Sequence, residues 1–386
     1  MPDKNKKIFI LAASPLTIQF FFRSHIKLLA KEYDVYLAFN NCSDDYVLPL
    51  NLPVTQIQLD IFRKVSILAD IKCFFQLLSL YKKHRFDIVV TLVPKAGFLG
   101  IVTAWLAGVS VRIHIFQGEV WSSCRGILRV IYKYADTITA LFATHILAVS
   151  RSEKSFLERS GVVDPYKIQV LGAGSIGGVD LKKFNSSAYS SERTRTELGV
   201  PAEAFVIIFV GRVVRDKGIF ELVEAFNLLS MQYSNVHLLI VGPDEEGLAP
   251  LLFDSSNPNA GKVTVIGYTH NPEKYLSIAN LLCLPSHREG FGMVVLEAAA
   301  MGIPAIGSSV YGISDAILDK ETGLLFQKSN VKALVDVIKK LIDDPNLLQS
   351  LGVAAKQNVQ NHFDADKVVK QYVDFIRKVD KERFKI

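Results

Sequence analysis

Short, almost continuous apolar runs alternate with helix-length amphipathic segments along most of the chain. In the first half, the apolar runs span residues 6–14, 33–40, 86–93, 111–117, 144–150 and 167–174. Helical patterns separate several of these runs, at residues 22–32, 67–84 and 97–107. Apolar strands that alternate with helices are typical of a parallel sheet covered on both faces. Residues 1–184 are therefore predicted to form one doubly wound, Rossmann-like α/β domain.

The same alternation resumes after a polar, serine-rich segment. Residues 185–204 contain no apolar run and are interpreted as a linker with a short helix. The apolar runs that follow span residues 205–212, 236–242, 262–267, 281–286 and 303–309, with a helix expected over 218–230. A second doubly wound domain is predicted over 205–363. Residues 364–386 are predicted to form a C-terminal helix, and its return to the first domain stays open.

Composition supports two packed domains in a reducing compartment. Of the 386 residues, 49% are hydrophobic and 21% charged, which excludes a disordered tail or a coiled coil. The cysteines lie far apart, without a C-x-x-C pair or a neighbouring histidine: Cys42, Cys73, Cys124 and Cys283. This spacing excludes a disulfide framework and a structural zinc site.

No segment is interpreted as an export signal or a membrane span. The first apolar run is interrupted by Pro15, Thr17 and Gln19, so a buried first strand explains it better than a signal peptide. The uncharged stretch between Lys95 and Arg112 contains three glycines and is shorter than the roughly 20 residues of a spanning helix. A buried helix is the better interpretation of this stretch.

Positive charge is concentrated in the first half of the chain. Residues 1–200 carry 25 Lys and Arg against 16 Asp and Glu, whereas the remainder carries 19 against 22. Such asymmetry indicates a basic half that meets an anionic partner. The sequence has no aromatic RNA-binding motif, no zinc-finger spacing and no run of five basic residues, so no nucleic acid partner is expected.

The segment after the first strand of the second domain brings positive charge next to glycine. Gly211 ends the strand, the loop carries Arg212, Arg215 and Lys217, and Gly218 opens the next helix. Cations and unpaired N–H groups at a helix N-terminus bind anions such as phosphate. Ligands of open α/β sheets bind beyond the carboxyl ends of the strands, so a phosphate site is predicted here.

Two glutamates flank a glycine-rich turn later in the second domain. The turn reads Glu289-Gly290-Phe291-Gly292, and the apolar helix that follows carries Glu297. A carboxylate inside an apolar helix is costly to bury without a hydrogen-bonding partner. Hydroxyl groups of a ribose or a sugar could supply those hydrogen bonds, whereas a helix cap and an ordinary amphipathic glutamate would explain each residue separately.

Other nucleotide and metal motifs do not fit. Residues 14–17 read Ser-Pro-Leu-Thr where a nicotinamide-binding fold would have G-x-G-x-x-G, and residues 211–218 do not match a Walker loop. Asp364-x-Asp366 opens a predicted helix, so capping by Asp364 is a better interpretation than metal binding.

The motifs V-G-R-x4-K-G and E-G-F-G-x4-E resemble those of retaining glycosyltransferases of family 4, which have the GT-B fold. The resemblance covers nearly the whole chain and implies two Rossmann-like domains that face each other across a cleft. The stretches around residues 14–25, 111–121, 144–150 and 170–184 resemble bacterial members that build capsule, O-antigen or other undecaprenyl-linked polysaccharides.

The resemblance implies a role for each matching residue of the second domain. Arg212 and Lys217 would hold the donor diphosphate and stabilise the leaving nucleotide, in place of a metal ion. Glu297 would accept hydrogen bonds from the ribose. Glu289, with the backbone of Gly290–Gly292, would face the donor sugar; Gly211 and Phe291 complete this donor site. No cofactor is expected, and no side chain is assigned as a nucleophile.

In the first domain, the resemblance implies three contacts. His114 is a candidate for the residue that contacts the donor sugar or the acceptor hydroxyl, against the alternative of a buried structural histidine. Glu119 could orient a hydroxyl, although many relatives carry Gln there. Ser14 and Thr17 lie in the loop that approaches the pyrophosphate and the acceptor, without the double glycine of other members.

Two basic segments of the first domain indicate contact with a membrane surface. Arg125, Arg129 and Lys133 are spaced by four residues, which places them along one helical face. Residues 62–85 combine six Lys and Arg with apolar and aromatic residues. Basic amphipathic helices bind anionic lipid, although a solvated face on a core helix is the common alternative.

The sequence thus predicts a metal-independent, retaining glycosyltransferase of the cytoplasm that associates with the inner face of the bacterial plasma membrane. It would transfer a hexose or N-acetylhexosamine from a nucleotide diphosphate, preferably UDP, to a glycan on undecaprenyl diphosphate. Two alternatives stay open: a nucleotide-sugar epimerase of GT-B fold, which needs no lipid acceptor, and a non-catalytic binding protein of the same fold.

Overall fold

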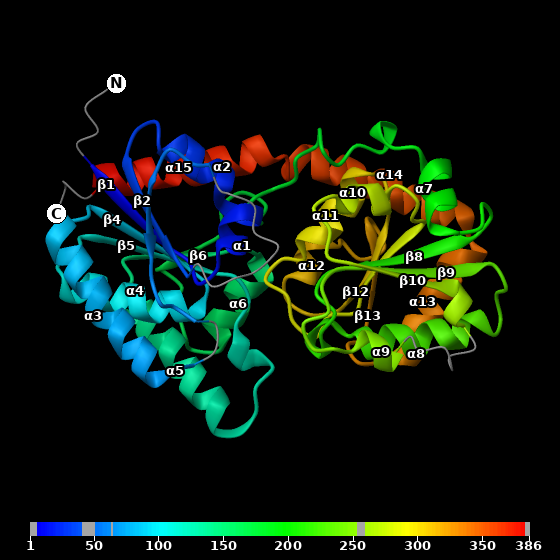
Figure 1. Ribbon diagram of the computed structural model, residues 1–386, viewed down its shortest axis with the longest axis horizontal. Helices are drawn as coiled ribbons and strands as arrows, with labels where there is room; N and C mark the ends of the chain where they lie inside the picture. Colours follow the sequence, from blue (N-terminus) through cyan, green and yellow to red (C-terminus); the bar gives the residue numbers. More distant parts are fainter. Residues whose placement is uncertain (1–5, 41–50, 63–64, 253–258, 383–386) are drawn as a thin grey trace. The chain divides into compact units, whose positions relative to one another are not determined.

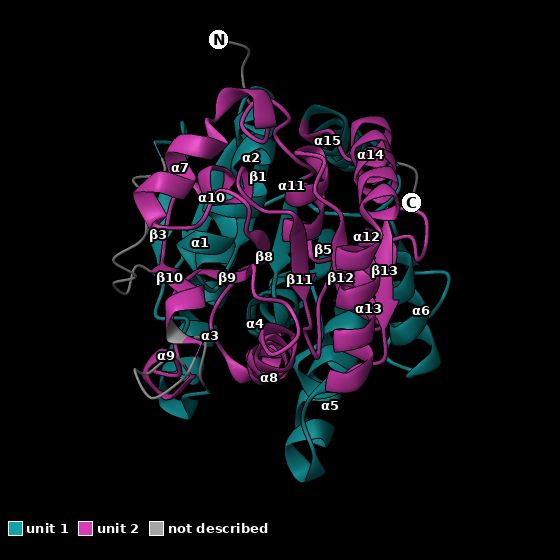
Figure 2. Ribbon diagram, turned by 90° about the vertical axis from the view of Figure 1, so that its right-hand side faces the viewer, with its two compact units in different colours: residues 1–177, 366–386 teal, residues 178–365 magenta. Residues whose placement is uncertain are grey.

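The computed structural model describes residues 6–40, 51–62, 65–252 and 259–382, so Cys42, Arg63 and Lys64 lie outside the described residues. The chain divides into two compact units (Figure 2). The first unit comprises residues 1–177 and 366–386, and the second comprises residues 178–365. The C-terminal helix is thus grouped with the N-terminal residues, and residues 185–204 lie in the second unit.

A seven-stranded parallel sheet forms the centre of the first unit (Figure 1). In spatial order its strands are β3 (Thr55–Gln58), β2 (Asp34–Phe39), β1 (Lys7–Leu11), β4 (Ile88–Leu92), β5 (Val111–Phe116), β6 (His145–Ala148) and β7 (Ile168–Gln169). Every side chain of β4 is buried, as expected for a strand covered on both faces. The apolar runs of the sequence therefore predicted these strands correctly, except for the edge strand β3.

Helices cover both faces of this sheet. They are α1 (Pro15–Thr17), α2 (Arg23–Leu29), α3 (Ile67–His84), α4 (Pro94–Leu106), α5 (Gly126–Phe142), α6 (Arg151–Arg159) and α15 (Ala365–Glu382). The helix predicted over residues 22–32 is confirmed as α2 over Arg23–Leu29, although the helical segment as a whole begins earlier than predicted. The helical segment begins at Pro15, where the Ser14 hydroxyl accepts from the Leu16 N–H at 3.2 Å, and a π-helical turn over Ile18–Phe22 precedes α2.

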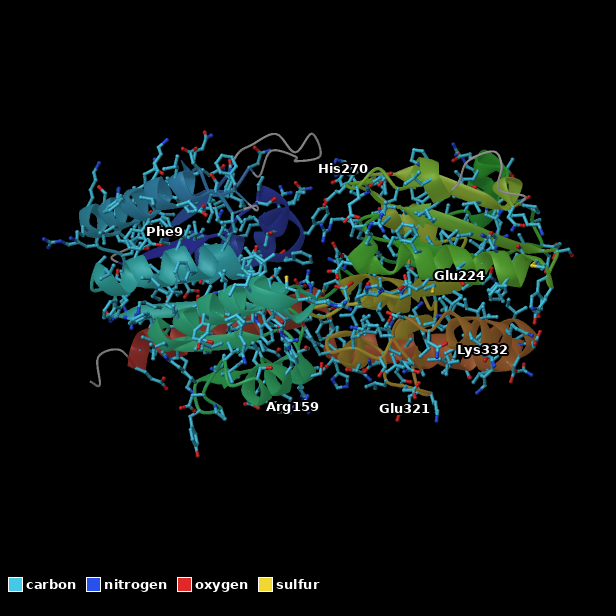
Figure 3. All side chains as sticks on the ribbon, turned by 90° about the horizontal axis from the view of Figure 1, so that it is seen from below. Phe9, Arg159, Glu224, His270, Glu321 and Lys332 are labelled. Carbon is cyan, nitrogen blue, oxygen red and sulfur yellow. The ribbon has the colours of Figure 1, made fainter. Side chains whose placement is uncertain are left out.

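The core of the first unit is rich in aromatic rings. Phe9 of β1 lies inside the unit (Figure 3), with its ring centroid 5.0 Å from that of Tyr81 and 4.9 Å from that of Phe86. The C-terminal helix α15 completes this unit. Its Asp380 carboxylate accepts from the Lys6 ammonium at 2.8 Å and from the Tyr33 hydroxyl at 3.2 Å.

A six-stranded parallel sheet forms the centre of the second unit. In spatial order its strands are β10 (Val263–Gly267), β9 (Val236–Val241), β8 (Phe205–Val210), β11 (Leu281–Leu284), β12 (Ala305–Ser308) and β13 (Gly323–Phe326). Its helices are α7 (Ser191–Leu198), α8 (Ile219–Ser230), α9 (Ala249–Leu252), α10 (Pro272–Leu276), α11 (Met293–Ala300), α12 (Ile313–Ala316), α13 (Val331–Asp343) and α14 (Pro345–His362). Strand β13 was not predicted, and α8 and α11 begin within a residue of their predicted starts.

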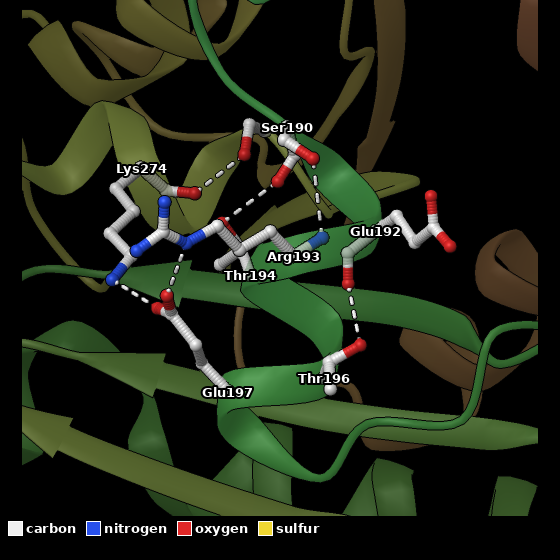
Figure 4. A network of polar contacts seen from close by, with 8 residues as sticks. Ser190, Glu192, Arg193, Thr194, Thr196, Glu197 and Lys274 are labelled. Carbon is white, nitrogen blue, oxygen red and sulfur yellow. Dashed lines mark hydrogen bonds and ion pairs between the residues drawn. The ribbon is translucent and has the colours of Figure 1, made fainter.

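Helix α7 is the short helix expected in the polar segment, and polar contacts fix it to its own unit (Figure 4). The Ser190 hydroxyl caps it by accepting from the Arg193 N–H at 3.3 Å. Glu197 then receives two cations, Arg193 at 2.9 Å and Lys274 of α10 at 2.6 Å. The segment between the apolar stretches is therefore an ordered part of the second unit.

Candidate active site

Close backbone contacts shape the carboxyl edge of the second sheet. Gly218 has a φ of +70°, and a Cβ atom there would lie 2.1 Å from the Pro285 carbonyl oxygen. Likewise, a Cβ atom on Gly242 would lie 1.8 Å from the Gly211 carbonyl oxygen. Only glycine fits such approaches. The loops after β8, β9 and β11 are therefore packed together at one edge, where open α/β sheets bind their ligands.

The two cations of the sequence motif lie in this edge, each beside a carboxylate. The Lys217 ammonium donates to the Glu289 carboxylate, which also accepts from the Ser286 hydroxyl at 3.1 Å. The Arg212 guanidinium contacts Glu245 at 2.8 Å and is more exposed than Lys217. An anionic ligand bound here would compete with these carboxylates for both cations.

A second layer of contacts fixes the turn that carries Lys217. This 3₁₀ turn spans Arg215–Lys217. The Asp216 carboxylate accepts from Arg288 at 3.0 Å, and its carbonyl oxygen accepts from the His287 N–H at 2.9 Å. The His287 ring contacts Glu221 of α8 at 2.7 Å. The sequence analysis did not find Asp216, His287 and Glu221, because their contacts join loops that are some 70 residues apart in the chain.

The glycine-rich turn presents backbone rather than side chains. Gly292 caps α11 with a φ of +73°. Phe291 is buried and packs on Phe363 with ring centroids 5.4 Å apart, so its ring belongs to the core. A Cβ atom on Gly312 would lie 2.6 Å from the carbonyl oxygens of Glu289 and Gly290. The turn is thus held closely against its own unit.

Glu297 extends from α11 without a protein partner. Its side chain is only partly exposed, and within the described residues nothing donates a hydrogen bond or forms an ion pair to its carboxylate. Burial raises the pKa of Glu297 to about 7, with Lys183 opposing and Glu273 adding to this effect. Lys183 itself pairs with Glu273 at 3.4 Å and donates to the His270 carbonyl oxygen at 3.0 Å. The carboxylate is therefore available to ligand hydroxyls.

The structure places His114 inside the sheet of the first unit. Its Nδ1 atom lies 2.8 Å from the Thr91 hydroxyl, and its ring packs so closely on α4 that a Cβ atom on Gly97 would lie 2.4 Å from it. Burial lowers the pKa of His114 to about 3, so the ring is neutral. These contacts favour the structural alternative over a catalytic role.

The other first-unit candidates lie at the carboxyl ends of strands. Ser14 follows β1 and caps α1, and Thr17 ends that short helix, donating its N–H to the Ser14 carbonyl oxygen at 3.2 Å. Glu119 follows β5 and is buried. Since the spatial order is β1-β4-β5, these residues share one edge of the sheet, separated by a single strand.

Comparison with known proteins identifies the family. Residues 190–358 match the family described as glycosyl transferases group 1. The capsular polysaccharide biosynthesis glycosyltransferase CapM of Staphylococcus aureus is 30% identical over 375 residues, covering 94% of both chains. The chain belongs to the group 1 glycosyl transferases. The resemblance seen in the sequence motifs is thereby confirmed.

Other proteins similar to this glycosyltransferase agree with that family and with the fold. The Escherichia coli UDP-Gal:alpha-D-GlcNAc-diphosphoundecaprenol alpha-1,3-galactosyltransferase is 26% identical over 322 residues, covering 81% of this chain and 82% of that one. Anabaena HepE, solved with UDP and glucose, superposes with a TM-score of 0.80 at 16% identity, over 97% of this chain and 100% of the other. The predicted GT-B fold is confirmed.

The described part of this glycosyltransferase contains neither a membrane-spanning helix nor a group of metal ligands. Across the four described ranges, no helix is both long and apolar enough to cross a membrane. Over the same ranges, no group of three or more His, Cys, Asp or Glu side chains is arranged to hold a metal ion.

Proposed function

We propose that this glycosyltransferase moves a hexose or N-acetylhexosamine from a nucleotide diphosphate to a glycan on undecaprenyl diphosphate, in the synthesis of a surface polysaccharide such as capsule or O-antigen. UDP is the preferred nucleotide, because the E. coli relative is named for a UDP-galactose donor and Anabaena HepE was solved with UDP. The acceptor class rests on the diphosphoundecaprenol acceptors named in the E. coli and Campylobacter jejuni relatives.

Two observations carry the donor site: the pair Lys217–Glu289, and the Glu297 carboxylate on the helix that follows this turn, to which no described residue donates a hydrogen bond. A bound diphosphate would attract Lys217 and Arg212 away from their carboxylates. The two cations would then neutralise the charge that develops on the diphosphate as its bond to the sugar breaks. Preorganised positive charge around a departing pyrophosphate is the main catalytic contribution that such a site offers. Lys217 and Arg212 would thus take the place of a metal ion.

The remaining donor contacts follow from the same residues. Glu297 would accept hydrogen bonds from the ribose hydroxyls, and these bonds are stronger when its carboxyl is ionised. Glu289, released from Lys217, would face the sugar ring and its developing positive charge. The backbone of Gly290–Gly292 would contact the donor sugar next to Glu289. The product linkage would retain the anomeric configuration of the donor.

Binding of nucleotides tests the donor site. UDP, GDP, ADP, dTDP and CMP are titrated by calorimetry at pH 8 and pH 6, with Glu297→Ala and Glu297→Gln as variants. We expect one diphosphate to bind, with weaker binding at pH 6 because Glu297 becomes protonated below its pKa of about 7. The variants should bind weakly at both pH values. Wild-type protein that binds none of the nucleotides would contradict the proposal and favour a non-catalytic binding protein.

Acceptor dependence separates transfer from the epimerase alternative. A transferase releases UDP from a UDP-sugar at a rate that depends on the lipid-linked acceptor. An epimerase would convert the UDP-sugar without any acceptor. Conversion of this kind by the wild-type chain alone would contradict the transfer reaction while leaving the donor site intact.

We further propose that the first unit associates with the inner face of the plasma membrane. The first two turns of α5 expose apolar residues on all sides, and this part of the helix projects from its unit in both ribbon views (Figures 1 and 2). The exposed apolar residues of α5 are Ile127, Leu128, Val130, Ile131, Tyr134 and Leu141. Arg125 and Arg129 are exposed beside them. Apolar residues next to cations fit the boundary between headgroups and acyl chains.

Helix α3 of the same unit supports this membrane contact. Its exposed apolar residues are Ile67, Leu68, Ile71 and Phe75, with Leu68 84% exposed. Lys82 and Lys83 are exposed at its C-terminal end. Large exposed apolar patches on a protein usually mark an interaction surface. A lipid partner fits better than a protein here, because the relatives' named acceptors are themselves lipid-linked.

A further inference from the structure

Three carboxyl groups from separate segments meet in the interior of the first unit. Glu119 lies in the loop after β5, Asp136 on α5 and Glu153 in the first turn of α6. Their residues are 0%, 2% and 0% exposed. Burying a carboxyl group costs folding free energy unless the group is hydrogen-bonded or protonated. The role of the cluster therefore depends on the hydrogen-bond partners of the three groups.

Glu153 joins two loops through its carboxyl group. One oxygen accepts from the Gly118 N–H, and the other accepts from the Val149 N–H at 2.8 Å. Ser150-x-x-Glu153 has the pattern of a capping box, and the Ser150 hydroxyl does accept from the Glu153 N–H at 3.1 Å. The glutamate, however, reaches beyond its own helix to Gly118. Since β5 and β6 are neighbours, Glu153 ties together two strand-end loops.

Three residues after Gly118, the same loop reaches the buried side chain of Trp121. Trp121 donates its indole N–H to the Asp136 carboxylate at 2.9 Å and stacks on Phe156 of α6 with centroids 5.0 Å apart. The cation on this side is Lys133, whose ammonium lies 5.8 Å from the Trp121 ring centroid. The loop from Gly118 to Trp121 is therefore held at both ends by buried carboxyl groups.

The Glu119 carboxyl lies next to that of Glu153, and two neighbouring buried carboxyl groups cannot both be ionised, so one of them carries a proton. Burial and the neighbouring Glu119 carboxyl raise the pKa of Glu153 well above its ordinary range, although its two backbone donors oppose this. Burial raises the pKa of Asp136 to about 7, again with a contribution from Glu119. The cluster therefore retains a proton near neutral pH.

We propose that Glu153 is a positioning residue for the transfer reaction, which fixes the loop from Gln117 to Ser122 while it shares one proton with Glu119. The inference rests on the proposed function, because this loop follows a strand end on the edge where the acceptor-side residues lie. Loss of the shared proton at alkaline pH places two charges in the interior. Repulsion between the two carboxylates then displaces Glu119, and the loop that carries it loses its arrangement.

Fluorescence of Trp121 tests the loop without any measurement of activity. The chain contains two tryptophans, so Trp105→Phe leaves Trp121 as the sole reporter. We expect a fluorescence transition as the pH rises into the alkaline range in this background, and its loss in Glu153→Gln and in Glu119→Gln, since an amide does not titrate and the pair then has no shared proton to lose. Glu158→Gln, on the same helix but paired with Lys154, is the matched control and should keep the transition.

Three outcomes would overturn the inference. One is a Trp105→Phe protein without any transition. Another is an unchanged midpoint in Glu153→Gln. The third is a transition that disappears in Asp136→Asn alone, which would assign the signal to the tryptophan's own hydrogen-bond partner. Should Glu153→Gln fail to fold, Glu119→Gln still tests the shared proton, because the bonds of Glu153 to Gly118 and Val149 remain.

The pH profile of transfer is the second readout. With a UDP-sugar and GlcNAc-diphosphoundecaprenol as substrates, kcat/KM should fall about tenfold per pH unit above the pKa of the pair. In Glu153→Gln this alkaline decline should be absent, with a lower plateau. UDP binding should be the same in both proteins. Wild-type protein that does not bind UDP contradicts the proposed function, whereas normal UDP binding with an unchanged decline contradicts only the role of Glu153.

Discussion

The charged residues of the candidate donor edge differ in whether they already form an ion pair within the protein. Lys217 is paired with Glu289, and Arg212 with Glu245, whereas the Glu297 carboxylate has no such partner in the described parts of the chain. A ligand must therefore displace a carboxylate from each of the two cations, whereas it can donate hydrogen bonds to Glu297 without displacing any protein group. The electrostatic contribution of Lys217 and Arg212 should consequently appear in turnover, when charge develops on the leaving diphosphate.

We expect Lys217→Ala to reduce kcat by at least about 100-fold, and the double variant with Arg212→Ala to reduce it further. The Arg212 side chain is 44% exposed, whereas Lys217 is 18% exposed and pairs with Glu289, so kcat is compared at a temperature at which every variant is folded. Arg215→Ala is the matched control from the same loop, since Arg215 contacts Glu246 and the Phe220 ring. Turnover close to wild type in a folded double variant would rule out the phosphate site.

Buried histidines make the protein sensitive to acid. Burial lowers the pKa of His25 to about 3, and its ring stacks on Phe22 at 4.5 Å. The unfolded chain binds a proton near pH 6.5, so the free energy of unfolding falls as the pH drops below that value. At pH 5 the loss from His25 is about 2 kcal/mol.

His25→Phe should remove that part of the acid sensitivity. Urea unfolding at pH 7 and pH 5 measures it: the difference in unfolding free energy between the two pH values should be about 2 kcal/mol smaller than in the wild type. An equal pH dependence in both proteins would show that His25 is already protonated in the folded state.

Among the elements, apolar runs predicted the buried strands well and the edge strands poorly. Residues 88–92 are buried on both faces, and the run that predicted them was nearly continuous. Strand β3 reads Thr-Gln-Ile-Gln and is mostly exposed, so it offers no apolar run. The predicted bounds of α3 agree with the structure, whereas the split helix after β1 depends on Pro15 and the Ser14 cap.

The basic amphipathic pattern of helix α5 fits either a membrane-binding face or a solvated face on a core helix. Its basic spacing was visible in the sequence, but only the structure shows that Ile127 is 71% exposed and has no neighbouring core to cover it. The buried residues of α5 are Asp136, Thr139 and Ala140, all in the second half of the helix. The first half of α5 is thus the better candidate for membrane contact.

Replacing Arg125, Arg129 and Lys133 by Gln should lower binding to vesicles that contain anionic lipid, by about 1 kcal/mol per cation at low salt. Ile127→Ser with Ile131→Ser should lower binding at high salt as well, because burial of apolar side chains is not screened. Co-sedimentation with vesicles measures both. The matched control removes three lysines of the second unit, Lys328, Lys332 and Lys340, and should have little effect. Equal partitioning of all variants would contradict the membrane face.

For the whole molecule, the meeting of the candidate donor residues at one sheet edge could be predicted because these residues are close to one another in the sequence. Gly211 to Lys217 and Glu289 to Glu297 are contiguous motifs at strand ends, and the order of the strands brings them to one edge. Glu153 could not be found in this way, since its bond to Gly118 depends on the pairing of β5 with β6. The sequence likewise could not decide between a buried and a catalytic His114.

Removal of α15 should unfold the first unit and spare the second. This helix buries a row of apolar side chains, each contributing about 1.5–3 kcal/mol, and holds Glu32 through Arg377 at 3.0 Å. Their sum exceeds the stability of a typical domain. Calorimetry and limited proteolysis of residues 1–364 should show one remaining transition, with UDP binding retained. Two unchanged transitions would show that α15 is dispensable.

The same helix has a consequence for how the protein is made. Residues 178–365 form one uninterrupted stretch, so the second unit can fold as soon as that stretch has left the ribosome. The translation of the first unit starts earlier, but this unit receives its last helix only after the second unit has been translated. The unit whose translation starts first is therefore completed after the other, and until α15 has been made the apolar surface that it covers stays exposed to water.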